Sequence, residues 1–254
     1  MPSSPAPAPP PFVRLAAHPL RWQLLVALAE SDQRVRELVA RVGRPQNLVS
    51  YHLRLLRAGG LVSARRSSFD GRDCYYRLDL DACAAALGET AAALHPALRP
   101  AAAARRGGAR PRSRRVAVLF VCSGNSARSP IAEALLRHHA GDRVTALSAG
   151  TRPKARLHPE TARVLAGYGI DVAGRRPRGL DAHHGRRIDW LITLCDRARE
   201  ACPELPQRPR RSHWSIPDPA AAPDPADAFA RTAADIERRV RHLLPVLDPP
   251  GGPP

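Results

Sequence analysis

Apolar side chains recur at helical spacing in three short segments near the start of the chain. They fall at Trp22, Leu25 and Leu28, at Val35, Leu38, Val39 and Val42, and at Leu48, His52, Leu55 and Leu56. Apolar positions three or four residues apart place one face of a helix against a core, so three short helices are predicted. Gly59-Gly60 ends the third helix, and two extended runs around Asp70-Gly71 predict a β-hairpin. Helices followed by such a hairpin predict an α+β winged helix-turn-helix domain.

A different pattern begins near residue 114, where apolar runs alternate with amphipathic segments. The runs predict strands at 116–121, 144–148, 190–194 and 212–216, and the amphipathic segments predict helices at 131–140, 159–168 and 227–247. Strands that alternate with helices are typical of an α/β domain with a parallel sheet. We therefore expect a four-stranded parallel sheet flanked by helices.

These two patterns predict two domains, which 254 residues can accommodate. Residues 12–87 are assigned to the winged helix-turn-helix domain and residues 114–247 to the α/β domain. Residues 88–113, rich in alanine, arginine, proline and glycine, are interpreted as a basic linker, with a helix from Asp81 to Leu98 extending the first domain. The proline-rich ends, residues 1–11 and 248–254, are predicted to be disordered.

The segment that joins the first strand of the α/β domain to its helix carries candidate chemistry. It reads Cys122-Ser123-Gly124-Asn125-Ser126-Ala127-Arg128-Ser129-Pro130. A short loop of small residues between a strand and a helix turns its backbone N–H groups inward, where they can bind the oxygens of a tetrahedral anion. These groups, the helix N-terminus and Arg128 favour the thiolate form of Cys122, to which Ser129 can donate a hydrogen bond. We predict a nucleophile in an anion-binding loop, with a buried structural cysteine as the alternative.

This segment resembles the loop of the low-molecular-weight tyrosine phosphatase superfamily, Cys-x-Gly-Asn-x-x-Arg-Ser-Pro, and the resemblance extends over about residues 114–247. It implies the fold of that superfamily for the second domain. It also implies that Asp218, in Ile216-Pro217-Asp218-Pro219, is a general acid that protonates the leaving oxygen. Asp224-Pro225 is interpreted instead as the start of the last helix.

Two further cysteines, Cys195 and Cys202, follow the third predicted strand of this domain. They lie about two helical turns apart, so a disulfide between them requires the segment to unwind. Two unrelated thiols are one interpretation, but the pattern Thr-Leu-Cys-x6-Cys-Pro resembles the resolving pair of thioredoxin-coupled arsenate reductases. The resemblance implies that Cys122 attacks arsenate, that Cys195 attacks Cys122 and releases arsenite, and that Cys202 attacks Cys195.

No bound cofactor and no metal are expected for this reaction. Thioredoxin would reduce the final disulfide, or a small thiol would act on Cys122 directly. A protein tyrosine phosphatase is the main alternative, because phosphate and arsenate share shape and charge. Two features weigh against it: Asp218-Pro219 is followed by alanines rather than by aromatic residues, and Ala127 stands where tyrosine phosphatases of this family tend to carry a second cysteine.

The segment from Gln46 to Val62 closely resembles the recognition helix of ArsR/SmtB-type repressors, which enters the major groove of DNA. The resemblance implies contacts to bases or phosphates from Gln46, Asn47, Ser50, Tyr51 and Arg54. Further cations that favour DNA lie on the hairpin at Arg65, Arg66 and Arg72. We expect a homodimer on double-stranded operator DNA, and a helical module for dimerisation or protein docking is the alternative.

Sensing of arsenite by this domain has weaker support in the sequence. Cys74 and Cys83 are its only thiols, and the predicted helix that contains Leu38, where arsenite sensors of this family often place paired cysteines, has none. A trivalent arsenic site normally takes three thiolates, so Cys74 and Cys83 are incomplete candidates unless a dimer partner contributes.

Composition adds a formal net charge of +17, which suits a nucleic-acid partner. No apolar stretch reaches the length of a membrane span, and the start of the chain lacks the apolar core of a signal peptide. We therefore expect a cytoplasmic protein with no membrane partner, since a reduced thiol survives there. The sequence favours a bifunctional arsenic-resistance protein, a reductase fused to a repressor. The alternatives are a DNA-binding phosphatase and a repressor whose second domain senses an anion without catalysis.

Overall fold

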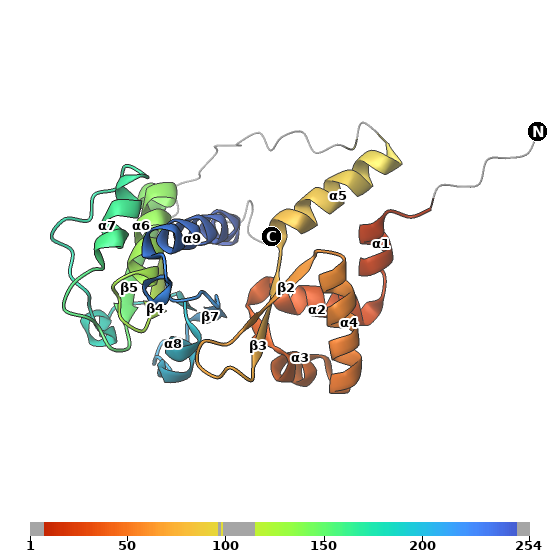
Figure 1. The fold of residues 1–254 in the computed structure, drawn as a ribbon, viewed down its shortest axis with the longest axis horizontal. Coiled ribbons are helices and arrows are strands. Elements are labelled where there is room, and N and C mark those ends of the chain that lie inside the picture. The colour runs from red at the N-terminus through yellow and green to blue at the C-terminus, as the bar shows by residue number, and fades with distance from the viewer. Residues whose placement is uncertain (1–7, 96–97, 99–114, 248–254) are drawn as a thin grey trace, which may run out of the picture. The chain divides into compact units, whose positions relative to one another are not determined.

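The computed structural model describes residues 8–95, 98 and 115–247 of the chain (Figure 1). The chain forms two compact units, an N-terminal one and a C-terminal one whose main part begins near residue 112. Parts of the predicted termini and linker, residues 1–7, 96–97, 99–114 and 248–254, lie outside the described residues. None of the described helices is both long and apolar enough to cross a membrane.

The N-terminal unit is a winged helix-turn-helix, as the sequence predicts. Its helices are α1 (Pro11–Ala16), α2 (Pro19–Glu30), α3 (Val35–Val42), α4 (Gln46–Ala58) and α5 (Leu80–Leu94). Its strands, β1 (Gln33–Arg34), β2 (Val62–Arg66) and β3 (Cys74–Leu78), pair antiparallel in the order β1-β3-β2. Local signals set the ends of these helices: the His18 imidazole caps α2, and Gly43, at a φ of 60°, ends α3.

The core of this unit differs from the apolar stripes of the sequence at two positions. Leu24, Val49 and Leu53 are fully buried, whereas Trp22 and Leu48 are 55% and 39% exposed. Side chains one residue apart on a helix point about 100° away from each other, so Leu48 faces the surface beside the buried Val49, and Trp22, two positions from Leu20 and Leu24, lies on the side of α2 away from them. The helix expected from Asp81 to Leu98 is α5, which ends at Leu94.

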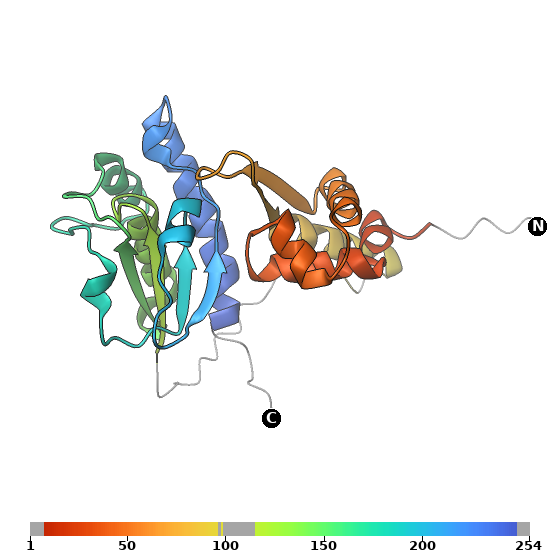
Figure 2. The ribbon, with the colours of Figure 1, turned by 90° about the horizontal axis from the view of Figure 1, so that it is seen from below.

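The C-terminal unit is an α/β domain, and Figure 2 shows its strands side by side. The four strands are parallel in the order β5-β4-β6-β7, which confirms the predicted fold class. They are β4 (Val116–Cys122), β5 (Val144–Gly150), β6 (Trp190–Thr193) and β7 (Arg210–His213). The helices are α6 (Arg128–Ala140), α7 (Pro159–Ala166), α8 (Asp196–Ala201) and α9 (Pro225–Leu247), and the 3-10 turns are η2 (Gly141–Arg143), η3 (Leu180–His183) and η4 (Pro219–Ala221).

Apolar packing joins these helices to the sheet. Helix α6 packs against β4 and β5, and α9 packs against both α6 and α7. Phe120 of β4, Leu135 of α6 and Phe229 of α9 are fully buried in one continuous cluster. Burial of three such large side chains on a strand and two helices fixes the position of α6, and with it the loop that precedes α6.

The fourth strand lies earlier than predicted. It spans Arg210–His213, whereas the apolar pattern placed it at 212–216. Trp214 and Ile216 are buried although they follow the strand, and the Trp214 ring lies 5.7 Å from that of Phe120. Burial by packing of a loop gives the same apolar signal as burial in a strand, and the sequence pattern does not separate the two.

Parallel pairing brings the carboxyl ends of all four strands to one edge of the sheet. Three backbone hydrogen bonds tie the segments that leave this edge to one another: Thr151 N–H donates to Cys122 O at 3.0 Å, Leu194 N–H to Val121 O at 2.7 Å, and Trp214 N–H to Thr193 O at 2.9 Å. The predicted reactive residues all follow these strand ends, so the fold gathers them at one place.

Candidate active site

Residues 122–129 form a closed loop between β4 and α6. Its carbonyl groups point away from the loop centre, because they accept hydrogen bonds from the segment after β5. Ser123 O accepts from Arg152 N–H at 2.8 Å, Gly124 O from Lys154 N–H at 2.9 Å, and Ser126 O from His158 N–H at 2.9 Å. The backbone N–H groups of residues 123–127 have no partner within the described part of the chain. Free N–H groups ahead of a helix N-terminus can bind the oxygens of an anion.

Two backbone features allow this loop to form. Asn125 has a φ of 45°, a left-handed conformation that asparagine tolerates better than most residues. Gly150, at the end of β5, lies against the loop so closely that a Cβ there would be 2.9 Å from both Asn125 N and Ser123 O. Glycine at this position is therefore required by contact with the backbone of the loop.

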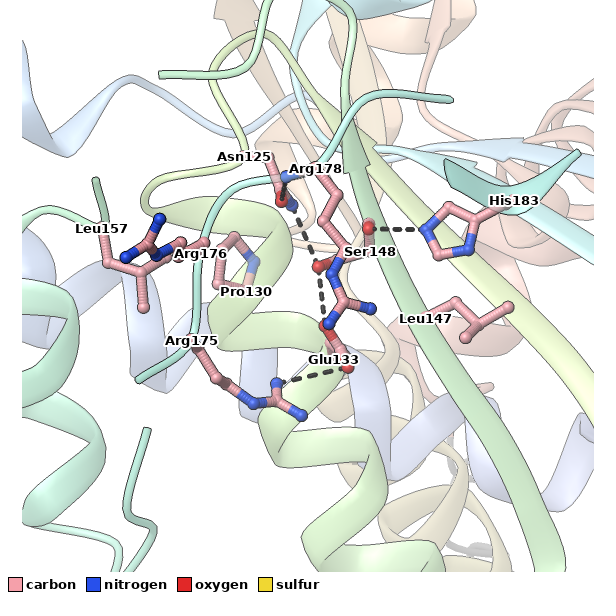
Figure 3. Close-up of a pocket in the computed structure, with 10 residues that line it drawn as sticks. All are labelled: Asn125, Pro130, Glu133, Leu147, Ser148, Leu157, Arg175, Arg176, Arg178 and His183. Atoms are coloured by element: carbon pink, nitrogen blue, oxygen red, sulfur yellow. Dashed lines mark hydrogen bonds and ion pairs between the residues drawn. The ribbon is translucent and has the colours of Figure 1, made fainter. Parts of the chain in front are cut away.

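A chain of hydrogen bonds behind the loop orients its side chains (Figure 3). Asn125 Nδ2 donates to Ser129 Oγ and Ser148 Oγ, each at 2.9 Å, and Ser148 Oγ donates to Glu133 Oε2 at 2.6 Å. Asn125 Oδ1 accepts from Arg178 N–H at 2.7 Å, which fixes the orientation of the amide. Ser129 Oγ thus accepts from Asn125 and donates its own proton to Ala149 O at 3.2 Å.

Cys122 lies at the base of the loop and is 2% exposed. Its Sγ lies 3.0 Å from Ser129 Oγ, which also lies 3.2 Å from Ala149 O. Free backbone N–H groups and the N-terminus of α6 lie at the loop around this sulfur and can bind the oxygens of an anion there. The arrangement suits a thiolate nucleophile.

Arg128 is buried beside Cys122 at the start of α6. Its Nη1 donates to Ile216 O at 3.1 Å and its Nη2 lies 3.1 Å from Asp218 Oδ2. Its Nε is buried and has no partner among the described residues. A buried cationic N–H without an acceptor is costly, and an anion in the loop supplies one.

The segment after β7 carries Asp218 to this loop. Its carboxylate is half exposed and pairs with Arg128, while Pro219 behind it is buried. The early end of β7 at His213 leaves Trp214–Pro217 to cross from the sheet edge to the loop. Asp218 therefore lies against Arg128 at the N-terminus of α6.

Cys195 is the second thiol at the loop. Its Sγ lies 3.3 Å from the hydroxyl of Ser123, the residue that follows Cys122, and it accepts from Ala198 N–H at 3.4 Å as the N-terminal cap of α8. Cys202 stands at the other end of α8 and is buried. Burial raises the pKa of the Cys202 thiol, and the nearby Arg211 partly offsets this effect.

No disulfide is present, since all five cysteines are free. Helix α8 separates Cys195 from Cys202 by seven positions, a rise of about 10 Å in an α-helix. That exceeds the Cα separation of about 7 Å that a disulfide tolerates. The structure therefore describes a reduced form of this pair.

Sequence reasoning missed a buried polar cluster beside Cys195. Asp196, fully buried, accepts from Ser215 Oγ at 2.5 Å and pairs with His213 Nε2 at 3.2 Å. The other ring nitrogen of His213 lies 2.8 Å from Thr193 Oγ1. The cluster ties the first residue of α8 to β6 and β7. No local sequence pattern indicates this cluster, because Asp196 and His213 are 17 positions apart.

The predicted DNA contacts lie on one face of α4 and on the wing. Val49, Leu53 and Leu56 of α4 face the core. The opposite face carries Gln46, Asn47, Ser50, Tyr51 and Arg54, all exposed except the half-buried Ser50. On the wing, Arg65 is half-buried, and Arg66 and Arg72 are exposed. The Arg54 guanidinium lies over the Tyr51 ring, 5.9 Å from its centroid.

Cys74 on β3 and Cys83 on α5 are both half-buried. Cys83 packs against the apolar core, and burial together with Asp79 raises the pKa of its thiol. A raised pKa opposes the thiolate that arsenite binding requires. Within the described ranges, no group of three or more side chains suited to a metal ion occurs.

Comparison with known proteins matches both units to families. The family of low molecular weight phosphotyrosine protein phosphatases matches residues 117–249, and the arsR family of bacterial regulatory proteins matches residues 18–64. An arsenate reductase of Bacillus anthracis is 32% identical over 126 residues, 50% of this chain and 92% of the relative. An arsenate reductase of Bacillus subtilis strain 168 is 30% identical over 130 residues, 50% of this chain and 93% of the relative. The crystal structure of an arsenate reductase from Archaeoglobus fulgidus shares 35% identity, covers 50% of this chain and 98% of its own, and superposes with a TM-score of 0.44.

Contact between Gly150 and the loop predicts the effect of a single added methyl group. Gly150→Ala places a carbon 2.9 Å from two backbone atoms, so the loop must shift. We expect a loss of about 1–3 kcal/mol in the free energy of unfolding and loss of phosphate binding. Chemical denaturation and calorimetric titration with phosphate measure the two effects. Gly71→Ala, where nothing lies within 4 Å of the added carbon, is the control, and equal behaviour of both variants would contradict the prediction.

Proposed function

We propose that this chain, which belongs to the low molecular weight phosphotyrosine protein phosphatase family, reduces arsenate to arsenite with Cys122 and binds DNA with its arsR-type winged helix. The observation that carries the reductase proposal is the position of Cys195. Its sulfur lies 3.3 Å from the hydroxyl of Ser123, beside the nucleophile. Phosphate ester hydrolysis has no use for a second thiol there, whereas a thiol relay requires one.

The first step forms a bond between Cys122 sulfur and arsenic. The loop N–H groups and Arg128 Nε bind the oxygens of arsenate, and the Cys122 thiolate attacks the arsenic atom. Asp218 donates a proton to the departing oxygen, which leaves as water. Arsenate that binds Arg128 competes with the Asp218 carboxyl group for the guanidinium.

The second and third steps move two electrons from thiols to arsenic. The Cys195 thiolate attacks Cys122 sulfur, a disulfide forms, and the electron pair of the sulfur–arsenic bond remains on arsenic, which leaves as arsenite. The Cys202 thiolate then attacks Cys195, releases the Cys122 thiolate and leaves a Cys195–Cys202 disulfide. A dithiol such as thioredoxin reduces this disulfide and completes the cycle.

Helix α8 has to unwind for the last exchange. Asp196 at its start is held by two side chains, Ser215 and His213, whereas the carbonyl of Cys202 at its end accepts one hydrogen bond, from Arg211 Nη2 at 3.3 Å. The anchored start keeps Cys195 at the loop, so unwinding brings Cys202 toward Cys195 rather than the reverse. Unwinding of α8 has a low free-energy cost, because a helix of six residues has little stability of its own.

Substitution of the resolving thiol tests the relay. Cys202→Ser retains Cys122 and Cys195, so we expect one arsenite per chain followed by arrest as a Cys122–Cys195 disulfide. Rapid-quench arsenite assays and peptide mass spectrometry measure the burst and the bond. Cys74→Ser, which removes a thiol of the other unit, is the control and should turn over normally. Continued cycling of Cys202→Ser with thioredoxin would show that Cys202 is structural and would favour a small thiol acting on Cys122.

A protein tyrosine phosphatase is the second candidate, since the matched family carries that name and phosphate shares the shape and charge of arsenate. We expect weak hydrolysis of p-nitrophenyl phosphate, because Ala220, Ala221 and Ala222 follow Pro219 in place of aromatic side chains that would hold a phenyl ring. Phosphate release and arsenate-dependent oxidation of thioredoxin are to be measured side by side, with Cys122→Ser as the blank for both. Efficient hydrolysis without thioredoxin oxidation would establish the phosphatase. If the chain showed neither of these two activities, the result would favour a domain that senses an anion without catalysis.

For the winged helix, we propose that two chains bind a palindromic duplex, each with α4 in the major groove. Support comes from the polar outer face of α4 and from exposed leucines on α5, Leu87 and Leu94, which a second copy would cover. Arg54→Ala should weaken operator binding about tenfold or more, as expected for loss of one base or phosphate contact. Arg41→Ala, which removes a cation paired with Glu30 on another helix, is the control. Equal binding by both variants in fluorescence anisotropy would remove α4 from the interface.

A further inference from the structure

A second basic surface lies on the C-terminal unit, at the edge of the sheet opposite Cys122. It is an open hollow of about 750 Å³ at the amino ends of β4, β6 and β7. Its lining includes Arg115, Arg187, Arg208, Arg210, Trp190 and Gln207. None of these residues contributes to the candidate active site.

Positive charge in this hollow is only partly balanced. Asp189 lines it, but its carboxylate is already engaged by Arg187 and by the N–H of Ala117 at 2.9 Å. Arg208 and Arg210 have no carboxylate partner among the residues that the structure describes. The Arg210 guanidinium lies 5.1 Å from the centroid of the Trp190 ring, which holds it in place at the wall of the hollow.

Arg208 also adopts an unfavourable backbone conformation. Its φ is 45°, a left-handed value that glycine adopts freely and that arginine adopts at a cost. Its N–H donates to Leu205 O at 3.0 Å, a bond that a glycine would make equally well. Strained backbone conformations cluster at functional sites. Among the described residues, no hydrogen bond or ion pair of the Arg208 side chain explains why this position carries an arginine.

We propose that this hollow binds the phosphodiester backbone of duplex DNA, as a second DNA-contacting surface on the same chain. Guanidinium groups grip phosphate oxygens in pairs, and Arg208 and Arg210 provide two such groups with no acid to satisfy them. The sequence that leads into Arg115 is Arg105-Arg106-Gly107-Gly108-Ala109-Arg110-Pro111-Arg112-Ser113-Arg114, which contains no acidic residue.

DNA is favoured over an acidic protein by the covalent link between the two units. The inference rests on DNA binding by the winged helix: once that unit holds a duplex, neighbouring phosphates are present at high effective concentration for the hollow. Even weak contacts then add to the affinity of the whole chain. An acidic protein partner has no such advantage.

The test compares two double variants of the full-length chain. Arg208→Gly with Arg210→Gln removes both unpaired guanidinium groups, and the glycine relieves the strained φ of residue 208. Arg163→Gln with Arg231→Gln is the matched control, because it removes the same charge from α7 and α9, where each arginine pairs with a carboxylate of its own helix. Binding of a random-sequence duplex is followed by fluorescence anisotropy between about 50 and 200 mM salt.

We expect the Arg208/Arg210 variant to bind at least about tenfold more weakly at low salt, with a salt slope smaller by about two, since each lost phosphate contact removes about 0.9. Its melting temperature should be no lower than that of the wild type, because the glycine relieves the strained φ at position 208, and its arsenate reduction should equal the wild-type rate. Wild-type affinity and slope in this variant would overturn the inference, as would an equal loss in the control. A wild-type chain that binds no duplex would overturn the winged-helix proposal as well, so the two failures are distinct.

Discussion

Parallel pairing of β4 with β5 on one side and β6 on the other is the constraint on which the candidate active site depends. Because β4 is central, the loop after Cys122 has neighbours on both sides. The segment after β5 takes the carbonyl groups of the loop, and the segment after β6 supplies Cys195. Loss of either pairing would leave the loop N–H groups without a fixed direction. The anion site is thus a property of the sheet as much as of the loop sequence.

Much of this arrangement follows from sequence, because local patterns carry it. The loop residues, the Asp218 segment and the Cys195/Cys202 pair are each contiguous, and the strand and helix alternation is strong enough to predict a four-stranded parallel sheet. Other features depend on contacts between distant residues and leave no local pattern. Asn125 to Ser148 and Asp196 to His213 are such pairs, and nothing in their neighbouring residues indicates them.

Errors at the level of single residues have the same origin. Leu48 lies one position from the buried Val49, and Trp22 lies two positions from the buried Leu20 and Leu24. Only packing against neighbouring helices determines which apolar residues of such a helix are buried. Residues 214–216 appear as a strand because burial of Trp214 and Ile216 produces the same composition as sheet pairing. The strand begins at Arg210, two residues before the predicted start at 212, and it ends at His213. This difference matters for function, because residues 214–217 then follow the strand and bring Asp218 to Arg128.

The difference between hydrolysis and reduction in this fold comes down to what stands beside Ser123. In the proposed mechanism the loop, Arg128 and Asp218 would serve either reaction, since each needs an anion, a thiolate attack and a protonated leaving oxygen. After that attack, a phosphatase needs water at the adduct, whereas a reductase needs a sulfur that can reach Cys122. The hydroxyl of Ser123 contacts Cys195 at 3.3 Å, and Cys195 is 2% exposed. A buried thiol held at the loop favours attack on the adduct's sulfur over hydrolysis, and this position supports the reductase as the function of the domain.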